Sequence, residues 1–381
     1  MLFSTLNFFF MSSLQAPRRL YALDALRGFD MFWIMGGERI FHAIAKATNS
    51  PFWEGLAHQF SHPEWNGFRV YDLIFPLFLF IAGVASPYST GRMLEKGATR
   101  RQLLLRVIKR GLILVLLGII YNNDLRIQPL SEIRFASVLG RIGLAWMFAN
   151  IIYLYTTSVK SRVTWFAGLV FGYWLLLMFT SAPGYPPGDL TIEGNFASYI
   201  DRLLLPGRLN TRGIHDPEGL LSTIPAIGTG LLGILTGEFL KNNPLTPRKK
   251  AMYMAGAGLA GIMLAQIWNL VFPINKNLWS SSFVLQVGGI SLILLAVFFY
   301  IIDIKGYKKW AFFFVVIGMN SILIYMSGTL IDWKNTTNAF FEWLVQLAGD
   351  PYGIVVFAVC FTAVKWAFLY FMYKKKAFLK I

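Results

Sequence analysis

The segment SHPEWNGFRVYDLIFPLFLFIAG, residues 61–83, joins a polar cluster to a long apolar run. The apolar run continues to about residue 91, which makes it long enough to cross a lipid bilayer as a helix. The polar side chains around its start are His62, Trp65, Asn66 and Asp72. Polar groups at the depth of Asp72 cost free energy in a bilayer, so this segment predicts both a membrane helix and a functional site.

The whole chain has the composition of a polytopic membrane protein. It has 381 residues, of which 56% are hydrophobic and 14% are charged, whereas a soluble domain has about 25% charged residues. We predict an all-α fold of about ten transmembrane helices, at 22–36, 70–91, 107–121, 138–157, 163–181, 219–240, 251–272, 279–301, 310–331 and 353–373. The only cysteine, Cys360, lies in an apolar run, so neither a disulfide framework nor a cysteine metal cluster is expected.

The distribution of Lys and Arg predicts how these helices are oriented. The basic gaps are the N-terminus, 92–110, 160–162, 241–250, 303–309 and the C-terminal tail, with 22 Lys and Arg and two acids. The alternate gaps hold nine Lys and Arg and thirteen acids. The positive-inside rule puts the basic gaps and both termini in the cytoplasm, and His62 and Asp72 in the extracytoplasmic half. The net charge of +16 is then a topology signal and does not indicate nucleic acid.

The same reasoning divides the chain into two parts. We expect an N-terminal cytoplasmic segment at 1–20, followed by a transmembrane domain at 21–381 with an extracytoplasmic loop at 182–218. The loop is rich in Gly and Pro and is expected to be folded on the surface.

Several polar residues fall within the expected helices. Arg27 lies three residues from both Asp24 and Asp30, so the three side chains share one helical face. Arg141 is flanked by glycines and needs a partner, which is either a bound anion or a protein carboxylate. Asn320 and Ser321 either bond neighbouring helices or line a path for a substrate.

The polar cluster at residues 62–72 has the residue types of an acyl-transfer site. A histidine takes up a proton near neutral pH, and Asp72 would orient the imidazole of His62. Asn66 or the indole of Trp65 would donate hydrogen bonds to a developing oxyanion. On these residues alone, a structural role for His62 stays open.

The order of motifs along the chain resembles that of a known family. The matching stretches are DALRGFD (24–30), HPEWNGFRVYDLIFPLFLFIAG (62–83), VLGRIGLAW (138–146), YIDRLLLPGRL (199–209), HDPEGLLSTIPAI (215–227), INKNLWSSSFV (274–284), GMNSILIY (318–325) and YKKKAFLKI (373–381). In these motifs the chain resembles the heparan-α-glucosaminide N-acetyltransferase family of transmembrane enzymes.

The resemblance implies transfer of acetyl from cytosolic acetyl-CoA, without a metal, to the amine of a terminal glucosamine across the membrane. The histidine of the family's H-x-x-W-N-G motif falls on His62, and the aspartate of its D-L-x-F-P motif falls on Asp72. The lysosomal enzyme has a lumenal N-terminal domain and a leading helix; we expect neither in this chain, which favours a bacterial inner membrane and a periplasmic amino-sugar or glycan acceptor. Membrane lipid and a second copy of the chain, as a homodimer, are the other expected partners.

The chemistry of the remaining polar residues divides them between the two substrates that the resemblance implies. We expect Trp65, Asn66, His215, Asp216 and Glu218 to hold the glycan. We expect Arg27, Arg100, Arg101, Arg106, Lys109 and Arg110 to bind the CoA nucleotide, whose pantetheine arm would pass Asn320, Ser321 and Arg141. The alternative that stays open is a transporter that moves a sugar or an anionic solute past Arg141 and Asp72.

Overall fold

The computed structural model describes residues 20–379 except residues 125, 127 and 212. The cytoplasmic segment predicted at 1–20 therefore lies outside the described residues, apart from Leu20. Within the described part of the chain there is no strand; the only β pairs are isolated bridges between Arg134 and Gly207 and between Thr211 and His215. The predicted all-α fold class is confirmed.

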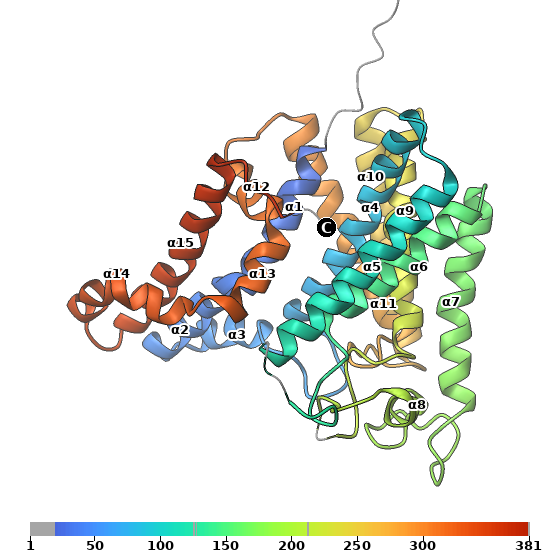
Figure 1. The fold of residues 1–381 in the computed structure, drawn as a ribbon, viewed down its shortest axis with the longest axis horizontal. Coiled ribbons are helices and arrows are strands. Elements are labelled where there is room, and N and C mark those ends of the chain that lie inside the picture. Colours follow the sequence, from blue (N-terminus) through green and yellow to red (C-terminus); the bar gives the residue numbers. More distant parts are fainter. Residues whose placement is uncertain (1–19, 125, 127, 212, 380–381) are drawn as a thin grey trace, which may run out of the picture.

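The helices form one bundle with a helical side lobe, which consists of the helices within residues 38–59 and 333–374 (Figure 1). Their bounds are α1 Tyr21–Phe32, π-helical η1 Trp33–Gly37, α2 Glu38–Thr48, α3 Pro51–Gln59, 3₁₀-helical η2 Val70–Leu73, α4 Ile74–Glu95, α5 Arg100–Asn123, α6 Val138–Tyr155, α7 Val159–Phe179, α8 Phe196–Leu204, α9 Thr223–Asn242, α10 Pro247–Asn269, α11 Ser281–Phe298, π-helical η3 Phe299–Ile304, α12 Ala311–Met319, α13 Ser321–Leu330, α14 Trp333–Ala348 and α15 Gly353–Lys374.

Seven of these helices are long and apolar enough to cross a membrane, or eight if α12 and α13 form one span bent by 63°. Two other expected spans are less apolar or shorter. α1 has 12 residues before its π-helical turn, and α5 begins with the basic stretch from Arg100 to Arg110. An integral membrane protein is supported, while the number of ten spans stays a prediction.

α5 begins seven residues before the expected span at 107–121. The reason is local, because Thr99 caps the helix: its hydroxyl accepts from Gln102 N–H at 3.3 Å, and Thr99 N–H donates to the Gln102 side chain at 2.9 Å. The basic residues after Thr99 therefore extend from a helix rather than from a loop.

The centre of the bundle is formed by α4 and α9, and α7 and α10 lie at its edge. In the most apolar stretch of each helix, 72% of α4 and α9 is buried, against 22% of α7 and α10. A Cβ on Gly83 of α4 would collide with the backbone of Gly230 in α9, and one on Gly233 would collide with the backbone of Phe80. Small residues therefore bring these two helices into backbone contact and fix the position of α4.

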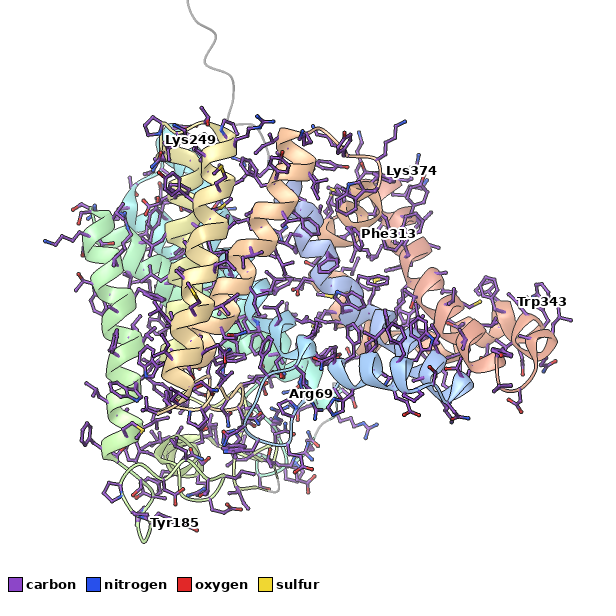
Figure 2. The ribbon with its side chains drawn as sticks, turned by 180° about the vertical axis from the view of Figure 1, so that it is seen from behind. Arg69, Tyr185, Lys249, Phe313, Trp343 and Lys374 are labelled. Carbon is purple, nitrogen blue, oxygen red and sulfur yellow. The ribbon has the colours of Figure 1, made fainter. Side chains whose placement is uncertain are left out.

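The two ends of the bundle differ in charge, and we name them accordingly. The basic end holds the turns at 96–99, 243–246 and 305–310, and the loop end holds the segments 60–69, 180–222 and 270–280. Figure 2 shows Lys249 and Lys374 at one end, and Arg69 and Tyr185 towards the other. The alternation of charge along the sequence therefore corresponds to two separate ends in space.

Candidate functional site

His62 and Asp72 lie together at the loop end. His62 Nδ1 is 2.6 Å from Asp72 Oδ1. The Asp72 side chain has 0% exposure, whereas that of His62 has 48%. An ionised carboxylate accepts only, so Nδ1 carries the proton of this bond and Nε2 keeps its lone pair. The pair thus presents a basic nitrogen from a ring that is held on a buried carboxylate.

Local structure explains why Asp72 is fixed. Asp72 is the third residue of the turn η2, and its Oδ2 accepts the Arg69 backbone N–H at 2.9 Å, as the acidic member of a capping box does. The Arg69 guanidinium in turn donates to the His62 carbonyl oxygen at 2.7 Å. Arg69, which sequence reasoning left without a role, therefore ties both members of the pair to one turn.

The segment that carries His62 is also attached to the 270–280 segment. Gly67 N–H donates to the Ile274 carbonyl at 2.8 Å, and the Asn275 amide donates to Asn66 Oδ1 at 3.0 Å. Gly67 has a φ of 120°, a conformation that favours glycine. These bonds bring a stretch more than 200 residues away in sequence against the histidine.

This attachment places Lys276 beside His62. Its Nζ is 3.0 Å from His62 Nε2, 3.2 Å from Nδ1 and 3.7 Å from Asp72 Oδ1. Burial lowers the pKa of Lys276, and the carboxylates of Asp72 and Glu218 oppose that shift. Sequence reasoning missed Lys276, although it lies within the motif INKNLWSSSFV that carried part of the family resemblance.

Trp65 is placed differently from the expected oxyanion donor. Its indole N–H donates to the Leu190 carbonyl at 2.8 Å, and its ring meets His215 edge-on with 5.1 Å between centroids. The donor is therefore already used, and Trp65 fixes the loop at 180–222 against the histidine segment. Asn66 stays exposed at the loop end.

His215, Asp216 and Glu218, the expected glycan contacts of the outer loop, lie in a network around Arg134. Arg134 donates to both oxygens of Asp216, at 3.0 and 2.8 Å, and to Glu218 at 2.5 Å. Burial would raise the pKa of Asp216, but the bonds from Arg134 lower it. His215 is 1% exposed, and burial lowers its pKa to about 4, so it is neutral at pH 7. Of the three, Glu218 alone is partly exposed.

Behind this network lie polar atoms that have no partner among the described residues. They are Arg141 Nε and Nη1, Asp201 Oδ2 and His215 Nε2. Arg141 bonds through Nη2 to the Gly219 carbonyl at 3.2 Å and to the Ser222 hydroxyl, and its guanidinium lies 5.1 Å from the Trp279 ring. The expected CoA contact at Arg141 therefore lies at the loop end.

The other expected cofactor residues lie at the basic end, where two adjoining cavities open, of about 530 and 490 Å³. Both are lined by Arg27, Arg92 and Arg106, and the second also by Arg110, Trp146 and Ser321. We call the two together the basic cavity. Arg110 lies 4.6 Å from the Trp146 ring. Arg92 was not among the expected residues.

Arg100, Arg101 and Lys109 do not line the basic cavity. All three are exposed, and Arg100 lies 5.7 Å from the ring of Tyr155. Of the neighbouring expected contacts on α5, Arg106 and Arg110 therefore face the cavity and Lys109 does not.

Asn320 lies at the break between α12 and α13, and it holds the C-terminal tail. Its amide donates to the Ala377 carbonyl at 2.9 Å, and its Oδ1 accepts from Leu379 N–H at 3.0 Å. Leu379 lines the basic cavity beside Ser321. The tail thus turns back into the bundle (Figure 1), and Asn320 acts on the cavity through it.

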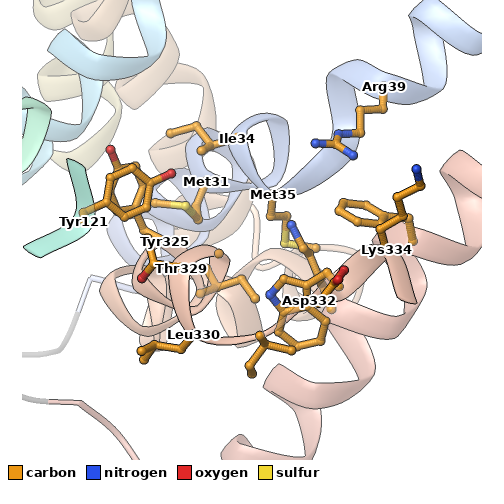
Figure 3. A pocket seen from close by; sticks show the side chains of 16 residues that line it. Met31, Ile34, Met35, Arg39, Tyr121, Tyr325, Thr329, Leu330, Asp332 and Lys334 are labelled. Carbon is orange, nitrogen blue, oxygen red and sulfur yellow. The ribbon is translucent and has the colours of Figure 1, made fainter. Parts of the chain in front are cut away.

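A third cavity of about 720 Å³ lies between the bundle and the side lobe, lined by α1, η1, α13 and α15 among others. Figure 3 shows Met35, Tyr325 and Arg39 around it. Arg39 and Lys365 lie 4.4 and 4.2 Å from the same Phe361 ring. Neither His62 nor Asp72 lines this cavity.

No cluster of three or more His, Cys, Asp or Glu that could hold a metal ion occurs in the described part of the chain. The chemistry available at the loop end is that of His62, Asp72 and Lys276. The fold and these two sites define the chain as a helical membrane protein that carries a histidine–carboxylate pair at one end and an arginine-lined cavity at the other.

Comparison with known proteins then gives the family. The model of the catalytic part of heparan-alpha-glucosaminide N-acetyltransferase matches residues 19–267, and the chain belongs to this family. The human protein of that name is 29% identical over 96% of this chain and 60% of its own length. The mouse protein is 30% identical over 84% of this chain and 56% of its own. The chain thus spans less than two thirds of the relatives it matches.

Proposed function

We propose that this chain is a transmembrane acetyltransferase that moves acetyl from acetyl-CoA at the basic end to the amine of a glucosamine or similar amino sugar at the loop end. The observation that carries the proposal is the 2.6 Å bond that fixes the half-exposed His62 on the buried Asp72. Family membership supplies the reaction class. The positive-inside rule makes the basic end cytoplasmic, where acetyl-CoA is available.

The donor site is the basic cavity. CoA carries several phosphates, and guanidinium groups bind phosphates with two parallel hydrogen bonds. Arg27, Arg92 and Arg106 line both of the adjoining cavities that make up the basic cavity. The nucleotide would dock there, while exposed Arg100, Arg101 and Lys109 contribute only to the positive potential around the entrance.

The acetyl group then has a short distance to travel. The basic cavity reaches Phe78 in α4 and Trp146 in α6. Phe78 is six residues from Asp72, which is about 9 Å at the rise of a helix. Trp146 is five residues from Arg141, or about 7.5 Å. An extended pantetheine arm has the length to cross such a gap, so the nucleotide can stay at one end while the thioester reaches the other.

His62 provides the base at the loop end. Nε2 takes a proton from the acceptor amine, whose nitrogen attacks the thioester carbonyl carbon, and the carbon–sulfur bond breaks with its electrons on sulfur. Asp72 holds the ring and stabilises the imidazolium. The proton then passes to the CoA thiolate. Trp65, Asn66 and Glu218 border the place proposed for the acceptor. The proposed location of the protein is the inner membrane of a bacterium.

The test is an assay of acetyl transfer by the purified protein from acetyl-CoA to glucosamine. The measured quantity is the rate at which the CoA thiol is released. His62→Ala should lower kcat by about 10²- to 10⁴-fold, the usual contribution of a general base, with unchanged affinity for CoA. Stoichiometric CoA release before any acceptor is added would instead identify His62 as an acetyl-carrying nucleophile. Wild-type turnover in folded His62→Ala would exclude both roles.

A further inference from the structure

Two candidate oxyanion donors are available at residues 62–72, and one of them is already bonded elsewhere. The Trp65 indole N–H donates to the Leu190 carbonyl, whereas the Asn66 oxygen accepts from the Asn275 amide, so the Asn66 NH₂ group is not used in that bond. A transfer from a thioester nevertheless develops negative charge on the carbonyl oxygen, and acyl-transfer sites stabilise it with fixed donors. The loop end therefore needs a donor close to His62 Nε2.

Lys276 has the position for this. Its Nζ is nearly equidistant from the two ring nitrogens of His62, at 3.0 and 3.2 Å. A position in the ring plane that is equally far from both nitrogens would collide with a ring carbon. The ammonium therefore lies over the face of the imidazole. The ammonium thus lies 3.0 Å from Nε2, the nitrogen at which the acceptor amine is proposed to react.

Lys276 also has hydrogen-bonding capacity to spare. An ammonium has three donors, and its separation of 3.7 Å from Asp72 Oδ1 exceeds a hydrogen bond. Its side chain is 17% exposed. Such a partly buried cation acts more strongly on a developing charge than an exposed one, because water screens it less.

We propose that Lys276 is a catalytic residue whose ammonium donates a hydrogen bond to the thioester carbonyl oxygen as that oxygen becomes negative. The proposal rests on the acetyl transfer proposed above. As the amine nitrogen bonds to the carbonyl carbon, the π electrons move to oxygen, which Lys276 stabilises. When the carbonyl re-forms, the carbon–sulfur bond breaks and its electrons leave on the CoA sulfur. Lys276 keeps its proton throughout, and His62 holds the proton of the amine.

The charged groups that face Lys276 set the pH at which it acts. They are His62 and Asp72 from the histidine segment, Glu218 from the outer loop and Arg141 from α6. Burial lowers the pKa of Lys276 from its ordinary value. Activity should therefore fall in alkaline solution as Lys276 loses its proton. An arginine at this position stays charged, so Lys276→Arg should move that alkaline limb to higher pH.

The experiment compares Lys276→Met, which has no hydrogen-bond donor, and Lys276→Arg with wild type, with Lys46→Met as the control, since Lys46 is an exposed lysine of α2. Loss of one oxyanion donor lowers kcat by about 10²- to 10³-fold. We expect this loss in Lys276→Met, with unchanged CoA affinity and melting temperature, and no loss in Lys46→Met. Lys276→Arg should retain more activity than Lys276→Met and show the displaced alkaline limb.

The outcomes separate the two proposals. If wild type transfers no acetyl to any amino sugar, the proposed function fails. If wild type transfers acetyl and folded Lys276→Met keeps its kcat within about threefold, the role of Lys276 as an oxyanion donor fails on the magnitude expected for such a donor. If Lys276→Met does not fold, Lys276→Arg decides: an active variant with an unchanged alkaline limb overturns the proposal.

Discussion

Replacement of Asp72 by asparagine tests the arrangement of the candidate site most directly. The carboxylate has two acceptor oxygens with two donors: Oδ1 faces His62 Nδ1 at 2.6 Å, and Oδ2 faces Arg69 N–H at 2.9 Å. Asparagine supplies one acceptor and one donor in the same space. One of the two contacts must therefore change character.

The Arg69 N–H decides which contact changes. If the asparagine NH₂ faced that N–H, a buried donor would be left without an acceptor, at about 1–3 kcal/mol. The amide should therefore turn its oxygen to Arg69 and its NH₂ to His62 Nδ1. The imidazole proton then moves to Nε2, and the lone pair that takes the proton of the amine is lost.

The magnitude follows from these two effects. Restoration of the productive tautomer costs about 1–3 kcal/mol, which is roughly 5- to 150-fold in rate. Loss of the carboxylate also removes the charge that stabilises the imidazolium, and such a loss at a histidine–carboxylate pair reaches about 10⁴-fold. We expect kcat of Asp72→Asn to fall by about 10²- to 10⁴-fold.

The assay is release of CoA thiol with glucosamine as acceptor, together with CoA affinity and melting temperature. The last two should stay close to wild type, because the arginines of the basic cavity lie at the opposite end of the bundle and the substitution preserves volume. A kcat within about threefold of wild type in a folded variant would refute the orientation argument, since the tautomer cost alone predicts more. Equal loss of CoA binding and of rate would indicate a structural role.

Two further predictions concern the basic cavity and the outer loop. Arg106→Gln and Arg110→Gln should each weaken CoA binding by roughly 10- to 150-fold, the value of a hydrogen bond to a charged group of about 1.5–3 kcal/mol, and Lys109→Gln should not; equal affinities in a titration would place the nucleotide elsewhere. Burial raises the pKa of Asp201 to about 7, so its contribution to stability is fully present below pH ~4 and is lost as the pH rises through about 7. Asp201→Asn should remove this decline of the melting temperature between about pH 5 and 8, and a slope equal to wild type would contradict the shift.

The sequence predicted those parts of the fold that depend on local properties. Length and hydropathy of a segment decide whether it can cross a bilayer, and the seven helices of sufficient length and hydropathy agree with expected spans. The His62–Asp72 contact could also be predicted from the sequence, because the two residues are only ten positions apart and one turn connects them. The expected span at 310–331 hid a break, since an apolar pattern does not report the 63° bend at Asn320.

Contacts between distant segments required the tertiary structure. Lys276 meets His62 across 214 positions, and nothing in the local pattern around either residue selects the other. Arg141 donates a hydrogen bond to the outer loop at the Gly219 carbonyl. The positions of the neighbouring helices decide that Arg106 and Arg110 of α5 line the basic cavity and that Lys109 does not. Periodicity and charge are set by residues close in sequence, and they therefore determine the helices and the character of each end. The packing of backbones at glycines and the bonds between loops decide which side chains meet, and these depend on the whole chain.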